Sequence, residues 1–332
     1  MGEDVSAQRV PDATEGEAKP IPGFGDREVR RYRIFSFDFD SRPQTLTEAP
    51  TDQWDSEARE LWEQSRVALL ASLRRQYGED HFERKVEDFA AFGAKPFSII
   101  AHHNALFEDV RTAFVNGAYY AALTSACTLG ERILNHLMLD LRDHFRSTPE
   151  YRSVYRKASF DRWSVAIDTL VAWDVMLPDV ASEYRSLERL RNRSVHFNAD
   201  TIARLREDAL KAAQLLKRII DGQFSAFGLQ PWFIAGTLGA GFIKREWEDR
   251  PFVRHYYLAN NLCVGPFHSI ELTWDGQHRF VDYPDYGAFC VDRLTDDQFR
   301  DLFNNCDQAA RARSAVAIEN EGPVPAGGEM TP

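Results

Sequence analysis

The sequence has no long apolar run, few cysteines and no C-x-x-C pair. The 332-residue sequence contains no apolar stretch of the ~18 residues that a membrane-spanning helix needs. The four cysteines (Cys127, Cys263, Cys290 and Cys306) lie far apart without a C-x-x-C pair, which argues against a disulfide framework and a thiolate zinc knuckle. We therefore expect a globular protein without a membrane segment, a structural metal or a cofactor.

Targeting and nucleotide-binding signals are also missing. The first residues, "MGEDVSAQRVPDATEGEAKP", lack the apolar core of a secretory signal, so we expect a cytoplasmic protein with reduced thiols. The chain has neither a glycine-rich phosphate loop nor a G-x-S-x-G elbow. These absences argue against P-loop nucleotide hydrolysis and α/β-hydrolase chemistry.

Charge is distributed unevenly along the chain. The whole sequence has a net charge of −11, yet residues 95–223 carry 18 basic and 16 acidic side chains. Arginines and a lysine recur from Arg142 to Arg162 and again from Arg185 to Arg193. Such a run can attract a polyanion locally, although a solvated helix face explains it equally well.

Composition divides the chain into five segments. Glycine, proline and acids predict a disordered leader and tail, and apolar periodicity predicts helices in the middle. The segments are a leader (1–28), an N-terminal strand and helices (29–96), a helical domain (97–223), a small β-rich domain (228–306) and a tail (307–332). The fold expected is mainly α, a helical bundle with an N-terminal extension and a β-rich C-terminal domain, α+β overall.

The clearest predicted helix covers 118–145. Its apolar residues recur at spacings of three and four, which is typical of a helix with one buried stripe: Tyr120, Leu123, Cys127, Gly130, Leu134, Leu137 and Leu141. Glu131 lies beside this stripe. Further helices are expected at 53–77, 81–92, 149–157, 161–174, 179–194 and 201–222.

Strands are expected at the N-terminus and after Gly228. "RYRIFSFDFD" alternates around Phe35, Phe37 and Phe39, and short aromatic and β-branched runs such as "FVRHYYLA" and "HRFVDYP" follow Gly228. Asp38 and Asp40 offer a possible divalent-cation site. Two aspartates on the polar face of one strand need no metal, however, so this remains the weaker interpretation.

The stretch "RLRNRSVHFNAD", residues 189–200, combines three polar groups at a helix end. Arg191 continues the apolar stripe of the preceding helix, so its charge needs a partner: Glu131, or an anion from outside. Asn192 and His196 are four residues apart and share a face while the helix lasts. Without further information, a salt-bridged staple between two helices explains the group as well as a reaction centre does.

The segment "RNRSVH" resembles the R-[polar]-x-x-x-H signature of the HEPN (higher eukaryotes and prokaryotes nucleotide-binding) ribonuclease superfamily, with Asn192 as the polar residue. "AFVNGAYYAALTSACTLGERILNHL", residues 113–137, is similar to the long helix of that family. The resemblance covers about 97–223. It implies an antiparallel helical bundle, metal-independent cleavage of RNA and a homodimer with a composite site, although the family includes members that bind without cutting.

The residues themselves fit this chemistry. In RNA the 2′-hydroxyl can attack the adjacent phosphorus, which requires a base, an acid and a cation. We expect His196 to carry the proton, Arg191 to bind the phosphate, and Asn192 to orient the imidazole or donate to the phosphate. Glu131 would support Arg191, and Arg193 would be a spectator or contact neighbouring phosphates.

The predicted function is therefore a metal-independent endoribonuclease acting on RNA as a homodimer, in the role of a toxin or antiviral defence effector. The β-rich domain would then serve as a sensor or a specificity module. The main alternative is a non-catalytic helical module that binds nucleotide or a protein. A metal-dependent hydrolase using Asp38 and Asp40 is a third interpretation with little support.

Overall fold

A computed structural model of the chain describes residues 28–35, 40, 42–160, 162–195, 202–259, 261–272, 278–282, 286, 293–306 and 316–318. The chain forms two compact units. The larger, here called the helical unit, comprises 33–235 and 239–262. The smaller, here called the mixed unit, comprises the chain up to 32, 236–238 and the chain from 263. The expected disordered leader lies, except for residue 28, outside the described residues.

The helical unit is built almost entirely of helices. In chain order it contains α1 (Arg42–Thr47), α2 (Ser56–Tyr77), α3 (Phe82–Phe92), α4 (Ala101–Val115), α5 (Tyr119–Leu141), the short η1 (Arg142–Phe145), α6 (Tyr151–Val154), α7 (Trp163–Ala172), α8 (Pro178–Val195), α10 (Leu205–Phe224), β2 (Gly241–Phe242), η2 (Arg245–Trp247), α11 (Pro251–Val253) and the π-helix η3 (Arg254–Leu258). The prediction of a mainly helical chain is confirmed. Within the described residues, no helix has both the length and the apolar composition needed to cross a membrane.

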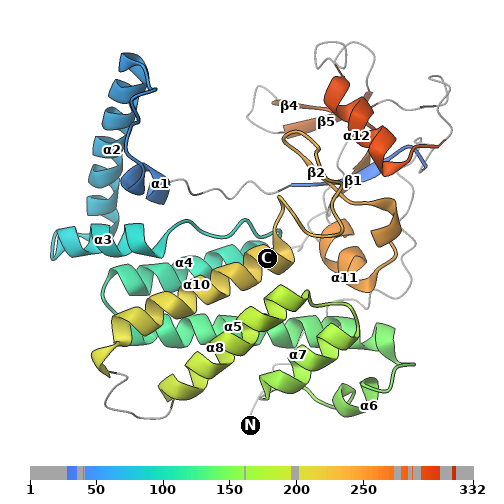
Figure 1. Ribbon diagram of the computed structural model, residues 1–332, viewed down its shortest axis with the longest axis horizontal. Coiled ribbons are helices and arrows are strands. Elements are labelled where there is room, and N and C mark those ends of the chain that lie inside the picture. The colour runs from blue at the N-terminus through green and yellow to red at the C-terminus, as the bar shows by residue number, and fades with distance from the viewer. Residues whose placement is uncertain are drawn as a thin grey trace, which may run out of the picture. The chain divides into compact units, whose positions relative to one another are not determined.

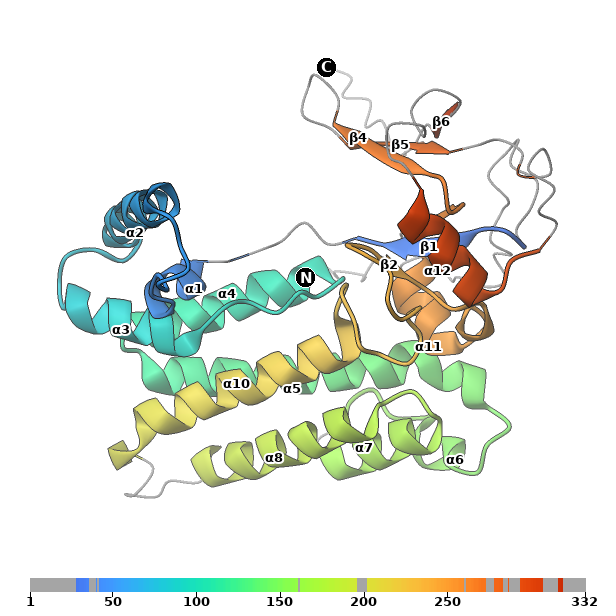
Figure 2. The same cartoon turned by 45° about the horizontal axis from the view of Figure 1, so that its top comes forward.

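Helix α5 is the centre of the bundle. It contacts α4, α7, α8 and α10, and both views show it running alongside α8 and α10 (Figures 1 and 2). The predicted stripe is buried from Leu123 to Leu141, as its spacing indicates. Tyr120 is the exception, because its side chain is 56% exposed in the first turn of the helix.

Gly130 allows α5 and α8 to approach each other closely. A Cβ atom at this position would lie only 2.8 Å from Cδ2 of Leu187, and 3.5 Å from the ring of Trp163. The hydroxyl of Tyr184 on α8 donates a hydrogen bond to the Gly130 carbonyl at 3.3 Å. Absence of a side chain at 130 therefore sets the spacing of the two helices.

Gly130→Val should destabilise the helical unit by about 2–3 kcal/mol, because the added methyl groups overpack a closed interface. Urea denaturation followed by circular dichroism measures the loss. The matched control is Thr128→Val, which introduces the same side chain at an exposed position of the same helix. Equal stability of the two variants would show that the interface tolerates the extra volume.

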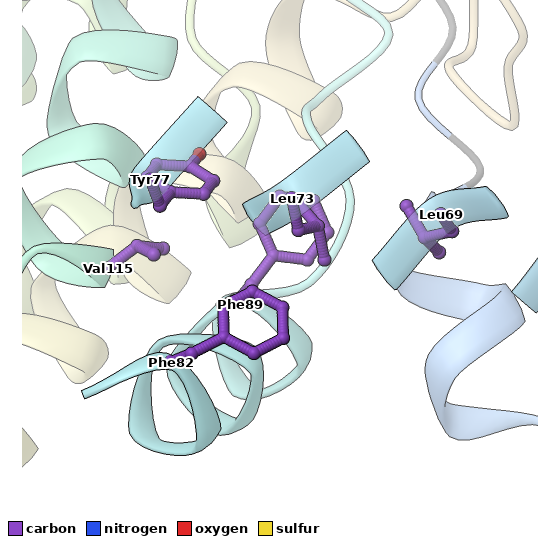
Figure 3. Packing of buried hydrophobic residues seen from close by; sticks show 6 residues of the cluster. All are labelled: Leu69, Leu73, Tyr77, Phe82, Phe89 and Val115. Atoms are coloured by element: carbon purple, nitrogen blue, oxygen red, sulfur yellow. The ribbon is translucent and has the colours of Figure 1, made fainter. Parts of the chain in front are cut away.

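A second core cluster joins α2, α3 and the end of α4. It consists of six buried side chains, which Figure 3 labels: Leu69, Leu73, Tyr77, Phe82, Phe89 and Val115. Leu69, Leu73 and Tyr77 recur at helical spacing, so one face of α2 supplies half of the cluster. Helix α2 is capped by Asp55, whose carboxylate accepts from the Ala58 amide at 2.7 Å.

Asp40 lies in a buried ion-pair network rather than in a metal site. Its carboxylate accepts hydrogen bonds from Arg42, at 2.8 Å from Nε, and from the fully buried Arg111. Arg111 also pairs with Glu108. Burial alone raises the pKa of Asp40, but the hydrogen bond from Arg42 and the charge of Arg111 outweigh it and lower this pKa to about 2. Asp38 lies outside the described residues.

The depressed pKa of Asp40 predicts a specific acid sensitivity. A carboxyl whose pKa is lowered on folding stabilises the protein above the unfolded pKa, and this contribution is lost as the pH falls from about 4 to about 2. Asp40→Asn should therefore lower the free energy of unfolding by about 2 kcal/mol near neutral pH and by progressively less below about pH 4. Urea titrations across this range test it, with the fully exposed Asp52→Asn as control. A difference that does not shrink in acid would contradict the assignment.

The region after α10 differs from the expected run of strands. "FVRHYYLA" was predicted to be β, but it forms the end of α11 and the π-helix η3. Its aromatic residues pack inward: Tyr257 is fully buried, and its ring lies 5.5 Å from that of Trp232. In this region β2 pairs with β1 (Arg31–Ile34), with Arg33 opposite Phe242. Residues 239–262 thus belong with the helices.

The mixed unit contains the β structure expected near the C-terminus. It includes β4 (Ser269–Leu272), β5 (His278–Asp282), β6 (Val316–Ile318) and α12 (Asp296–Asn305), and strand β3 (Leu262–Val264) begins at its edge. Strands β4, β5 and β6 form an antiparallel sheet in that order. Helix α12 begins with a capping box between Thr295 and Gln298. Strand β6 lies within 307–332, where no structure was expected.

Candidate functional site

Helix α8 directs Arg191 toward α5. Val180, Tyr184 and Leu187 are buried on one face of α8, and Arg191 follows at the same helical spacing. Its Nη2 atom lies 2.9 Å from Oε2 of Glu131. The contact between Arg191 and Glu131, one of the two partners that the sequence offers, is therefore present.

Trp163, at the start of α7, contacts both Arg191 and Glu131. Its indole Nε1 donates to Oε2 of Glu131 at 3.2 Å, and the Arg191 guanidinium carbon lies 5.4 Å above the centre of its ring. The ring is fully buried, so it is a fixed surface for the cation. Sequence reasoning missed Trp163. The only signal was an aromatic residue directly after the basic run.

Arg191 remains accessible despite these contacts. Its side chain is 28% exposed and that of Glu131 27%. A guanidinium has five N–H donors, and Arg191 forms no other ion pair with any residue that the structure describes. Donors are thus left for an anion that approaches from solvent, while Glu131 and Trp163 hold the group in place.

The two residues after Arg191 have different environments. Asn192 is exposed, and its side chain makes no hydrogen bond within the described part of the chain. Arg193 is half-exposed and pairs with Asp208 of α10 at 2.5 Å. Arg193 therefore ties α8 to α10, and its charge is already matched.

His196 lies outside the described residues. Helix α8 ends at Val195, directly before it, and the next described residue is Ile202. The structure thus brings together Arg191 and Glu131 of the predicted site, places Asn192 on the same helix, and does not place the imidazole.

Comparisons of the chain with family models, with curated proteins and with solved structures give no match. The resemblance to HEPN ribonucleases therefore rests on the motif from Arg191 to His196 and on the helical setting of that motif. What Arg191 does has to be argued from its surroundings.

Three histidines outside the motif lie together on α4 and α5. The His102 ring is 4.8 Å from that of His103 and 6.2 Å from that of His136. Burial lowers the pKa of His103 to about 3, and its Nδ1 is 3.2 Å from the hydroxyl of Ser98, so it is a neutral core residue. His136 follows Glu131 by five residues, which places it about 140° around α5 from that carboxylate. These imidazoles therefore do not supply a second proton carrier beside Arg191.

Cys127, one turn before Glu131, is not a nucleophile. Its thiol is buried on the stripe of α5, and burial raises its pKa to about 12 although the charge of Arg191 acts in the opposite direction. A thiol is reactive as the thiolate, which this environment disfavours. The chemistry of the site therefore depends on Arg191 and on the residues that follow it.

Metal ligands are not grouped in the part of the chain that can be described. Among those residues, no three histidine, cysteine, aspartate or glutamate side chains lie close enough to hold an ion. Asp40 is held by two arginines, and scattered His255 and His268 belong to different units. The metal-dependent interpretation therefore gains no support from these residues.

Proposed function

We propose that the chain is a metal-independent endoribonuclease of HEPN type. The observation that carries this proposal is the fixed, partly exposed guanidinium of Arg191, which is held by Glu131 and Trp163 five residues before His196. A staple between helices needs only the ion pair. An additional aromatic surface and free donors facing solvent suit a group that binds a phosphate.

The reaction proposed is internal transesterification. An imidazole removes the proton from the 2′-hydroxyl, the 2′-oxygen bonds to phosphorus, and the bond to the 5′-oxygen breaks as that oxygen takes a proton. The products carry a 2′,3′-cyclic phosphate and a 5′-hydroxyl, so atoms and charge balance without a co-reactant. Arg191 stabilises the negative charge on the phosphate oxygens in the transition state, and Asn192 orients the imidazole or donates to the phosphate.

A denaturing gel of total RNA incubated with the purified protein tests the proposal. We expect cleavage that persists in EDTA, and fragments whose 3′ ends resist ligation until the cyclic phosphate is removed. Such an activity suits a toxin or antiviral defence effector. Intact RNA together with measurable binding of nucleotide or of a protein would favour the alternative, a non-catalytic helical module.

A homodimer follows from the same mechanism. In-line displacement places the attacking and leaving oxygens on opposite sides of phosphorus, and each chain supplies one motif histidine, so two copies of the motif provide the base and the acid. Light scattering should report about twice the chain mass of 38.0 kDa. A protein that stays monomeric at assay concentration and still cuts RNA would rule out the shared site.

A further inference from the structure

An exposed basic segment connects η1 with α7. Four side chains, Arg152, Arg156, Lys157 and Arg162, are exposed on it, and we call them the basic strip. None of the four forms an ion pair with a residue that the structure describes, whereas the nearby Arg146 pairs with Asp143 at 2.8 Å. The segment also carries two acids: Glu150 forms no ion pair with these four cations, and Asp161 lies outside the described residues. As far as the described residues go, the strip therefore presents positive charge without ion-pair partners, on a chain whose net charge is −11.

Aromatic rings accompany these cations. Tyr155 is 39% exposed, and the guanidinium carbon of Arg156 lies 5.0 Å from the centre of its ring. The ring of Tyr151 is 5.6 Å from that of Tyr155, with 31° between their planes. An exposed ring beside cations can accept a flat, electron-rich group and the negative charge attached to it.

The backbone under the strip is anchored. Val154 and Phe160 are buried, and the side-chain Oδ1 of Asn135 accepts from the Phe160 backbone N–H at 2.8 Å. The guanidinium of Arg142 donates to the carbonyls of Val154, at 3.3 Å, and Lys157, at 2.5 Å. Because these contacts order the segment, little backbone entropy is lost when its side chains bind a ligand.

The strip leads to Arg191. Arg162 directly precedes Trp163, the residue whose ring lies under the Arg191 guanidinium. Asn135, which holds the segment at Phe160, lies one helical turn after Glu131 on α5 and donates to its carbonyl at 3.0 Å. A chain bound along the strip would therefore approach the candidate site from the α6–α7 side.

We infer that the basic strip, with Tyr151 and Tyr155, is a binding surface for single-stranded polynucleotide that continues from the phosphate site at Arg191. This inference rests on the proposed function, of which it specifies the substrate class. Phosphates would contact the four cations, and one or two unpaired bases would stack on the exposed tyrosine. A double helix keeps its bases stacked internally, and an acidic protein has no bases, so the tyrosines favour a single strand.

Binding can be measured without cleavage. The probe is a fluorescent 2′-O-methyl oligoribonucleotide of about 12 nucleotides, which lacks the attacking hydroxyl and falls within common site sizes. For single strands, the dependence of log affinity on log salt has a slope of about −0.7 per phosphate contact. Arg156→Ala/Lys157→Ala should therefore reduce the slope by about 1.4. Arg75→Ala/Lys211→Ala removes two exposed cations elsewhere and should leave the slope unchanged.

Tyr155→Ala tests the stacking contact. We expect affinity to fall by about 5-fold or more, and by no measurable amount in Tyr120→Ala, which removes a ring that is 56% exposed on α5. Melting curves should show that all variants fold. The inference is overturned if a duplex of the same sequence binds equally well, if Tyr155→Ala has no effect, or if polyglutamate of equal charge competes as strongly as the oligonucleotide.

Failure of this inference and failure of the proposed function are distinguishable. If the protein binds the oligonucleotide with the expected slopes but leaves RNA intact, the strip is a binding surface and the proposed nuclease function is wrong. If the wild-type protein cuts RNA and the Arg156→Ala/Lys157→Ala variant binds the oligonucleotide like wild type, the proposed nuclease function stands and the strip is not the binding surface.

Discussion

His196→Ala should slow RNA cleavage by about 10²- to 10⁴-fold, the usual contribution of a positioned general acid or base. The motif places this imidazole directly after the last described turn of α8, within six residues of Arg191. Rates should be measured under single-turnover conditions with excess enzyme, so that the chemical step is observed. Helical circular dichroism should remain unchanged.

The prediction is contradicted if the His196→Ala protein cuts RNA as fast as wild type. The motif would then be a structural feature of the helix end, and the binding-module interpretation would replace the nuclease. A loss that appears only in KM would instead point to a role in binding substrate rather than in proton transfer.

Arg191→Ala should lower the cleavage rate by about 10²- to 10³-fold, because it removes a fixed donor where negative charge develops. Arg191→Lys should recover little, since an ammonium cannot make the paired contacts of a guanidinium. In the proposed mechanism Arg191 and His196 act on the same phosphate, so the double variant should be about as slow as the slower single variant. Additive losses would mean that the two residues act independently.

Structural damage is a minor concern for Arg191→Ala. Glu131 is partly exposed and keeps the hydrogen bond from Trp163, so its charge is not left buried and unpaired. Arg189→Ala is the matched control, because this exposed arginine of the same helix hydrogen-bonds to Ser186 and forms no ion pair within the described part of the chain. Arg193→Ala should cost much less activity than Arg191→Ala, since the Arg193 charge is already matched by Asp208.

Glu131→Gln tests whether the negative charge of Glu131 is needed to position the Arg191 guanidinium. The amide can still accept from Trp163, but it no longer holds the guanidinium electrostatically. Under the proposed function, Arg191 would then contact the phosphate from a less defined position.

Helical periodicity predicted the contact between Arg191 and Glu131, because this contact follows from the packing of two helices. Cys127, Gly130 and Leu134 share a stripe on α5, and Tyr184, Leu187 and Arg191 share one on α8, so burying the stripes brings Arg191 to Glu131. The same rule failed at Tyr120. A helix end lies beyond its neighbours, so a residue there can continue the pattern without being covered.

Contacts between distant segments were beyond sequence reasoning. Trp163 lies 28 residues before Arg191 in the chain, and only the docking of α7 brings its ring under the guanidinium. "FVRHYYLA" has the composition of a strand, yet burial of Phe252 and Tyr257 against Trp232 favours helical backbone there. Pro251 in the first helical turn was the local sign of a helix.

The buried thiol of Cys127 provides a measure of how often the bundle opens beneath the site. Only 5% of its surface is exposed, so an alkylating reagent can reach the sulfur only after α5 separates from its neighbours. Mass spectrometry of the peptide that carries Cys127 would follow this event in the native protein, and the ratio of its labelling rate to that of an unfolded peptide gives the free energy of opening. Applied with and without bound oligonucleotide, the measurement would reveal whether ligand binding at Arg191 tightens the helices that hold it.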